Sequence, residues 1–325
     1  MAISTQRAIS SFVLSLVVAI APLAVSAQSL EELFVQGREA YEAGDFARAA
    51  EIWQQATAVN PADPMAQVWL ALSLYEQGDA NAALAILQAA ATSHPEIAAV
   101  HRSLGRVLAE QGDLEAAAQA YEQVIALEPE DATAYYSLGL TREQQEQYTA
   151  ASAAYRAAIT RAPDDPALYT ALGDVLKQQG DLTAAINVFR QAVAVEPSDP
   201  VLHRNLGVAL QAADRPDEAV IAYRRALDLD PDYATAYNDL GVVLWSQGEL
   251  TAAIAAYQAA IARDPDYADP YNNLGLVLQA QGDLTGAIEA YRRALALNPA
   301  DDIARANLAA AEQEQSQRQP RRSAP

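Results

Sequence analysis

The chain has 325 residues, of which 51% are hydrophobic but only 7% aromatic, and 74 are alanine. Alanine is the strongest helix former, so this composition favours helices and excludes an all-β fold and most α/β folds. The net charge of −21 argues against nucleic acid as a partner, because an acidic surface repels phosphates. The absence of cysteine excludes disulfides, thiolate metal sites and cysteine nucleophiles.

Residues 1–27 have the sequence features of a secretory signal peptide. Arg7 is their single charge, an apolar stretch occupies residues 12–21, and Val25 and Ala27 take the −3 and −1 positions of a cleavage site. The apolar stretch has about 10 to 13 residues, whereas spanning a bilayer takes about 20. An uncleaved signal anchor is the alternative, and only then would the protein be attached to a membrane. We expect export to a bacterial periplasm or secretion, with a thylakoid lumen as a further candidate.

A period of 34 residues organises the rest of the sequence. Prolines recur at this spacing at Pro61, Pro95, Pro129, Pro163, Pro197, Pro231, Pro265 and Pro299. Glycines recur at Gly105, Gly139, Gly173, Gly207, Gly241 and Gly275, and large rings at Tyr121, Tyr155, Phe189, Tyr223, Tyr257 and Tyr291. The residues from 28 to 301 therefore form an array of eight repeats: 30–63, 64–97, 98–131, 132–165, 166–199, 200–233, 234–267 and 268–301.

Each repeat contains two stretches of about thirteen residues with helical spacing, separated by a polar turn. In turns such as Gly180-Asp181, the glycine is expected to end the first helix in a left-handed conformation and the aspartate to cap the second. Junctions such as Asp165-Pro166 place an N-cap before a proline at the first helical position. One such helix pair cannot bury its apolar face alone, so the sequence predicts stacking between neighbouring repeats.

The repeated positions resemble the tetratricopeptide repeat (TPR) family over about 272 residues. In the last repeat the pattern comprises Tyr271, Leu274, Gly275, Leu278, Ala287, Tyr291, Ala294 and Pro299. The resemblance implies an all-α fold, an α-solenoid in which antiparallel helix pairs stack into a right-handed superhelix. Departures from the pattern include Ala71 for glycine, Gln36 and Arg142 for leucine, and Glu146 for a turn glycine.

The C-terminal end is predicted to protect the array from further stacking. Residues 302–315 continue the helical pattern but are polar, as suits a C-terminal capping helix. Residues 316–325 contain three arginines and two prolines, which predicts a disordered tail. A polar cap favours a monomer over self-association through the end repeats.

The sequence shows no catalytic, cofactor-binding or metal-binding constellation. His101 and His203 occupy a repeat position that is tyrosine elsewhere, so packing explains them, and no two histidines share a helix at ligand spacing. We therefore expect neither an enzyme nor a cofactor, and no small-molecule substrate is evident.

The resemblance implies a concave face, lined by the first helix of each repeat, that holds peptides or partner segments. One ladder of polar residues there consists of Asn205, Asp239, Asn273 and Asn307, whose amides suit peptide groups. A second polar row, Arg204, Asn238 and Asn272, and an apolar strip lie beside it. The predicted partner-binding residues in the second half are Arg204, Asn205, Asn238, Asp239, Asn272, Asn273, Val208, Val242, Leu276 and Trp245. Arg102, Arg106 and Tyr136 occupy matching positions in the first half, where the arginines are suited to a carboxylate. The alternative interpretation is that the asparagines are ordinary family sequence and the strip packs against the next helix.

These features predict an exported scaffold or adaptor that binds a protein or peptide segment. One alternative is the accessory portion of an enzyme system such as a glycosyltransferase, because some of those enzymes carry long TPR arrays with asparagine ladders. A self-associating structural protein is another alternative.

Overall fold

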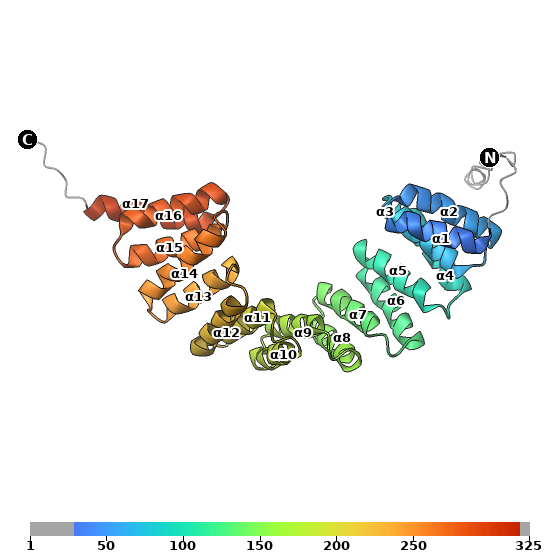
Figure 1. Cartoon of the computed structure of the whole chain (residues 1–325), viewed down its shortest axis with the longest axis horizontal. Helices are drawn as coiled ribbons and strands as arrows, with labels where there is room; N and C mark the ends of the chain where they lie inside the picture. Colours follow the sequence, from blue (N-terminus) through green and yellow to red (C-terminus); the bar gives the residue numbers. More distant parts are fainter. Residues whose placement is uncertain (1–28, 319–325) are drawn as a thin grey trace, which may run out of the picture. The chain divides into compact units, whose positions relative to one another are not determined.

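A computed structural model describes residues 29–318, which form seventeen α-helices and no strand (Figure 1). The predicted signal peptide and the last residues of the predicted tail, 319–325, lie outside the described residues. The helices are α1 (Leu30–Glu42), α2 (Phe46–Val59), α3 (Pro64–Glu76), α4 (Ala80–Ser93), α5 (Ala98–Glu110), α6 (Leu114–Leu127), α7 (Ala132–Gln144), α8 (Tyr148–Arg161), α9 (Pro166–Gln178), α10 (Leu182–Val195), α11 (Pro200–Ala212), α12 (Pro216–Leu229), α13 (Ala234–Ser246), α14 (Leu250–Arg263), α15 (Ala268–Ala280), α16 (Leu284–Leu297) and α17 (Asp302–Arg318). The all-α solenoid prediction is confirmed.

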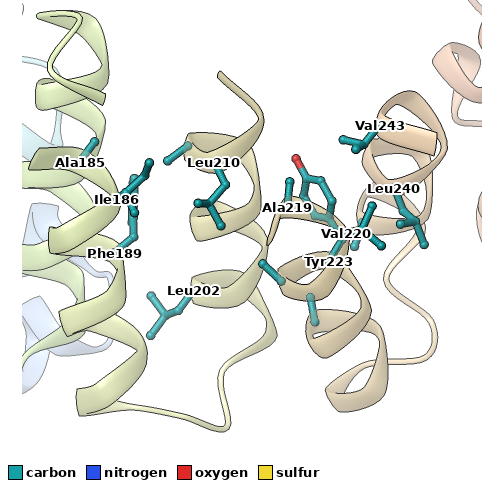
Figure 2. Packing of buried hydrophobic residues seen from close by; sticks show 14 of the residues in the cluster. Ala185, Ile186, Phe189, Leu202, Leu210, Ala219, Val220, Tyr223, Leu240 and Val243 are labelled. Carbon is teal, nitrogen blue, oxygen red and sulfur yellow. The ribbon is translucent and has the colours of Figure 1, made fainter. Parts of the chain in front are cut away.

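The helices belong to two units, residues 1–107 and 108–325, and the boundary falls within α5. In the second unit each helix from α7 to α16 packs against the helix before it and the helix after it, so the interior is a continuous series of helix–helix layers. Figure 2 shows Ile186 and Phe189 of α10 facing Leu202 and Leu210 of α11, while Tyr223 of α12 lies between α11 and α13. Stacking between neighbouring repeats therefore supplies the buried surface that one helix pair lacks.

The turn inside each repeat depends on a residue with positive φ. Glycine takes this role in six repeats, at Gly44, Gly78, Gly112, Gly180, Gly248 and Gly282, with φ between 76° and 89°. Glu146 and Asp214 stand at the same place in two other repeats with φ of 60° and 55°. Residues other than glycine rarely adopt this backbone conformation, so these two turns carry a local conformational cost.

Aspartate caps many of the second helices, which follow these turns, and several first helices at the junctions between repeats. The Asp181 carboxylate accepts the backbone N–H of Ala184 at 3.0 Å, and Asp165 accepts that of Ala167 at 3.0 Å in front of Pro166. Both predicted capping patterns are thus confirmed. The second helices that begin after Gln147, Arg215 and Glu249 have no side-chain cap.

The ring of the second helix packs closely against a recurring glycine of the first helix. A Cβ atom added to Gly207 would lie 2.6 Å from the ring of Tyr223, which is fully buried. The same close approach joins Gly37 to Trp53, Gly139 to Tyr155, Gly173 to Phe189, Gly241 to Tyr257 and Gly275 to Tyr291. In the second repeat both members differ together, because Ala71 replaces the glycine and Leu87 replaces the ring; both are fully buried. The larger residue at the glycine position is thus accompanied by a smaller side chain at the ring position.

The last helix, α17, covers the end of the array. Its Leu308 and Ala311 pack with Tyr291 of α16, while most of its other side chains are exposed. The helix ends at Arg318, three residues beyond the predicted end at residue 315, so residues 316–318 were wrongly assigned to a disordered tail. The cause is local: Ser316 Oγ donates to the Glu312 carbonyl, Arg318 pairs with Glu314 at 2.6 Å, and the first helix breaker is Pro320.

Candidate partner-binding face

The surface formed by the first helices α7, α9, α11, α13 and α15 of the second unit carries most of the predicted binding residues; we call it the first-helix face. Arg204, Asn205 and Val208 lie on α11 and are half-buried. Residues 34 positions later occupy α13, and those 68 positions later occupy α15. One turn of each helix is thereby presented side by side with the same turn of its neighbour.

A polar network links residues of the predicted ladder to residues of the second polar row in the neighbouring helix. Arg204 Nε donates to Asp239 Oδ2 at 2.7 Å, and Asn273 Nδ2 donates to Asn238 Oδ1 at 3.0 Å. Asn307 on α17 donates to Asn272 in the same way at 3.0 Å. Each bond joins residues 35 positions apart, so one helix of the face is held to the next by its own polar side chains.

Burial governs the electrostatics of this network. The pKa of the Asp239 carboxyl lies above its ordinary value because burial disfavours the charged form more strongly than Arg204, the opposing influence, favours it. Burial together with nearby Asp269 raises the pKa of Tyr267 to about 12. A carboxylate that remains charged in such surroundings depends on Arg204 and on the amide of Asn238, which also hydrogen-bonds to it.

The network leaves part of its hydrogen-bonding capacity available for a partner. Asn205 is half-buried, and its side-chain amide has no hydrogen bond to any other described residue. Asn273 uses its amide nitrogen and Asn272 its amide oxygen, which leaves the other half of each amide without a partner within residues 29–318. Asn238, by contrast, is only 6% exposed and is used within the network.

The apolar strip has a double character. Val208, Val242 and Trp245 pack against the core of the second unit, and Leu276 packs against the cluster beneath α17. All four keep part of their surface exposed. The strip therefore helps to join neighbouring helices and also presents apolar surface on the first-helix face.

Twelve positions before four of the buried rings lies a residue that matches the ring chemically. Tyr223 donates its hydroxyl to Gln211 at 2.9 Å, Tyr291 donates to Gln279 at 3.0 Å, and Tyr155 donates to Glu143 at 2.8 Å. Phe189 has no hydroxyl, and there the Lys177 ammonium lies 5.6 Å from the ring centroid.

Trp245 breaks this matching in the seventh repeat. It occupies the position of Gln211 and Gln279 but offers no acceptor, and the buried hydroxyl of Tyr257 has no hydrogen-bond partner among the described residues. An unsatisfied buried hydroxyl costs stability. Tyr257 was recognised from the sequence as one of the recurring rings, but its pairing with position 245 was not, although the constant 12-residue spacing is visible there.

The two buried histidines contribute to packing, as predicted. The Nε2 atom of His101 lies 2.9 Å from the Pro95 carbonyl oxygen, and that of His203 lies 3.0 Å from the Pro197 carbonyl oxygen. A carbonyl only accepts, so each ring carries its proton on Nε2. Tyr169, at the equivalent position, donates to Pro163 at 2.8 Å.

The three binding residues predicted in the first half divide between the units. Arg106 lies in the first unit, where its Nη2 is 3.5 Å from Glu76 Oε1 and its guanidinium is 6.0 Å from the Tyr75 ring centroid. Arg102 is half-buried on α5 in the same unit. Tyr136 lies on α7 in the second unit, where its ring centroid is 5.7 Å from that of Tyr155. An internal carboxylate, Glu76, thus already lies beside one of the two arginines.

Residues 29–318 lack the features of two other classes of site. No cluster of three or more histidine, aspartate or glutamate side chains there has the arrangement of a metal site. In the same range, no helix combines the length and the hydropathy needed to cross a membrane.

Helix pairs stacked in chain order, with polar and apolar rows on one face, define a helical-repeat scaffold. The chain belongs to the tetratricopeptide repeat family. The family profile described as the Cilia and flagella-associated protein 70 C-terminal domain matches residues 17–229, more than half of the chain, and two profiles described as Tetratricopeptide repeat match residues 206–268 and 268–301. This fold is typical of protein–protein interaction scaffolds, and the family is generally non-catalytic.

Two solved structures are similar to this chain to different degrees. The crystal structure of the APC/C hetero-tetramer Cut9–Hcn1 is similar with a TM-score of 0.51 and 20% identity, and the match covers 89% of this chain and 57% of that chain. This chain therefore spans little more than half the length of that relative. The crystal structure of MamA protein has a TM-score of 0.46 and 27% identity, covering 52% of this chain and 92% of that chain. Comparison with curated proteins found no match.

Proposed function

We propose that this protein is an exported, non-catalytic scaffold that binds an extended segment of a partner protein on the first-helix face of α11, α13 and α15. The observation that carries the proposal is Trp245. It is half-exposed on that face, in the place where a glutamine would satisfy the buried hydroxyl of Tyr257. Tryptophan is enriched among the residues that dominate binding energy at interfaces.

The surrounding polar groups suit an extended backbone. The unpaired amide of Asn205 and the unused halves of Asn272 and Asn273 present donors and acceptors along three neighbouring helices. A peptide bond offers one donor and one acceptor, so an amide side chain can bond to both without reading the peptide's sequence. The network that fixes Asn272 and Asn273 before binding reduces the ordering cost of association.

A photocrosslinking residue at position 242 tests this proposal in the native compartment. Crosslinking to a partner from position 242 is expected, whereas position 221 on α12, where Ile221 is 68% exposed on a second helix, should give none. The double variant Asn205→Ala, Asn272→Ala should reduce the crosslinked product at least about tenfold. The matched control is Asn187→Ala, an exposed asparagine on α10. Equal loss with the control, or no loss with the double variant, would show that the face is not the binding site.

Export is supported by the signal-peptide pattern of residues 1–27 alone. Sequencing of the mature N-terminus should give Gln28 as the first residue. A mature protein that begins at Met1 and sediments with membranes would instead establish the signal-anchor alternative.

A further inference from the structure

A hollow of about 470 Å³ lies on the first-helix face between α7, α9 and the start of α11. It belongs to the fourth to sixth repeats and contains none of the ladder residues. Its size is within the range of about 300–1,000 Å³ that is usual for ligand pockets. This volume accommodates a few large side chains of a partner segment.

The large apolar residues that line the hollow, which we call its floor, are partly exposed. Leu140 is 38% exposed and Val201 is 44% exposed, and both line the hollow together with Tyr136. Apolar side chains gathered in one depression, with a few polar groups beside them, are the usual lining of a binding site. Within the second unit, no described segment covers them.

The charged residues that line the hollow, which we call its rim, are all acidic. Glu143, Asp174 and Asp199 line it, and no arginine or lysine does so. Glu143 accepts from the Tyr155 hydroxyl at 2.8 Å and from the Gln178 amide at 3.3 Å, both neutral donors, so its charge is not compensated. Asp199 accepts a backbone N–H of α11 at 2.7 Å, and only Asp174 has a cationic partner, Lys177 at 2.8 Å.

We propose that this hollow docks a partner segment in which a large apolar side chain is flanked by arginine or lysine. The apolar floor would receive the side chain, and the uncompensated carboxylates of Glu143 and Asp199, together with Asp174 beside Lys177, would attract the flanking cations. The chain's own residues 319–325 include Arg321 and Arg322 but no large apolar side chain, so they match the rim and not the floor. This second site uses residues separate from the ladder and would select partners by charge.

The test uses fluorescence anisotropy with three labelled peptides and the mature protein. The first peptide is Gly-Arg-Arg-Leu-Leu-Arg-Arg-Gly, the second replaces every arginine with glutamate, and the third has the sequence of residues 314–325. The double variant Glu143→Gln, Asp174→Asn removes both charges. Gln211 and Gln279 already accept a tyrosine hydroxyl at the position equivalent to 143, so the substitution keeps the bond to Tyr155. The control, Asp228→Asn with Glu289→Gln, makes the same net charge change at exposed positions on second helices.

The first peptide should bind the unmodified protein, and the double variant should weaken binding about fivefold to tenfold, because rim charges each contribute modestly. The control should change binding less than twofold. Leu140→Ser should weaken binding at least about fivefold, and circular dichroism should confirm that every variant is folded. The glutamate peptide and the 314–325 peptide should bind at least about tenfold more weakly.

Three results would overturn the proposal: no binding of the first peptide, equal binding of the 314–325 peptide, or equal weakening by the control. If only the Asn205→Ala, Asn272→Ala variant weakens the first peptide, the ladder is the binding site and the hollow is not. If the Glu143→Gln, Asp174→Asn variant weakens binding of the first peptide and the Asn205→Ala, Asn272→Ala variant does not, this inference stands whatever the outcome of the crosslinking experiment.

Discussion

Replacing Tyr257 with phenylalanine should stabilise the protein, whereas the same change at Tyr223 should destabilise it. The Tyr257 hydroxyl is buried without a partner in the described residues, and such a group costs about 1–3 kcal/mol. Removing it should recover about 1 kcal/mol. Tyr223→Phe breaks the 2.9 Å bond to Gln211 and should cost about 1 kcal/mol.

The two variants should therefore differ by about 2 kcal/mol in the free energy of unfolding. For a unit of this size, this corresponds to a difference of about 4–8 °C in Tm. Urea and thermal unfolding followed by circular dichroism measure both quantities, with Tyr291→Phe as a second destabilised control because Tyr291 donates to Gln279. If Tyr257→Phe is as destabilising as Tyr223→Phe, the hydroxyl has a partner, such as a bound water, and the reasoning fails.

A double-mutant cycle isolates the same effect. Trp245→Gln supplies the acceptor that the sixth and eighth repeats have, so its effect should be more favourable by about 1 kcal/mol with tyrosine at position 257 than with phenylalanine. The cycle cancels the cost of losing the indole ring. A coupling energy of zero would show that position 245 does not control the hydroxyl.

Four further predictions concern packing, turn conformation, ionisation and assembly. Gly173→Ala should lower the free energy of unfolding by about 1–3 kcal/mol by pressing on Phe189, and adding Phe189→Leu should give a double variant at least about 1 kcal/mol more stable than the sum of the single effects. Asp214→Gly should raise the free energy of unfolding by about 0.5 kcal/mol, because it relieves a positive φ of 55°; a loss of stability would refute the strain argument. The raised pKa of Asp239 means that the folded state holds this proton more tightly than the unfolded state, so its contribution is lost as pH rises through the folded pKa. The unfolding free energy of the wild type relative to Asp239→Asn should therefore fall from about pH 4 upward, as measured by urea titrations across pH; a difference that rises with pH would contradict it. Light scattering should give a monomer mass at all concentrations, and a mass that grows with concentration would favour self-association.

Most of the fold could be predicted because it depends on residues that recur every 34 positions. Gly173 and Phe189 mark the close approach of two helices, and Asp165-Pro166 marks a helix start; each signal is local and repeated. The end of α17 was misjudged because it depends on single contacts, such as that between Arg318 and Glu314, which no repeat echoes.

The candidate site was less visible in the sequence. The period predicts that Arg204 and Asn273 lie on one face. It does not predict that their side chains bond to neighbouring repeats, which uses part of their hydrogen-bonding capacity for a partner. Asn238 looked like an exposed binding residue and is instead buried. The hollow beside Glu143 depends on the shapes of three helices together, which periodicity alone does not give.

The ring of each repeat and the glycine against which it rests are only 16 residues apart, so both lie inside one 34-residue block. Unequal recombination that duplicates or deletes a whole block would carry ring and glycine together and leave every remaining pair intact. An insertion of one residue between them would separate the pair with no substitute nearby. A change in the number of blocks would thus disturb the packing less than a change in the length of one block, and the eight blocks contain no insertion.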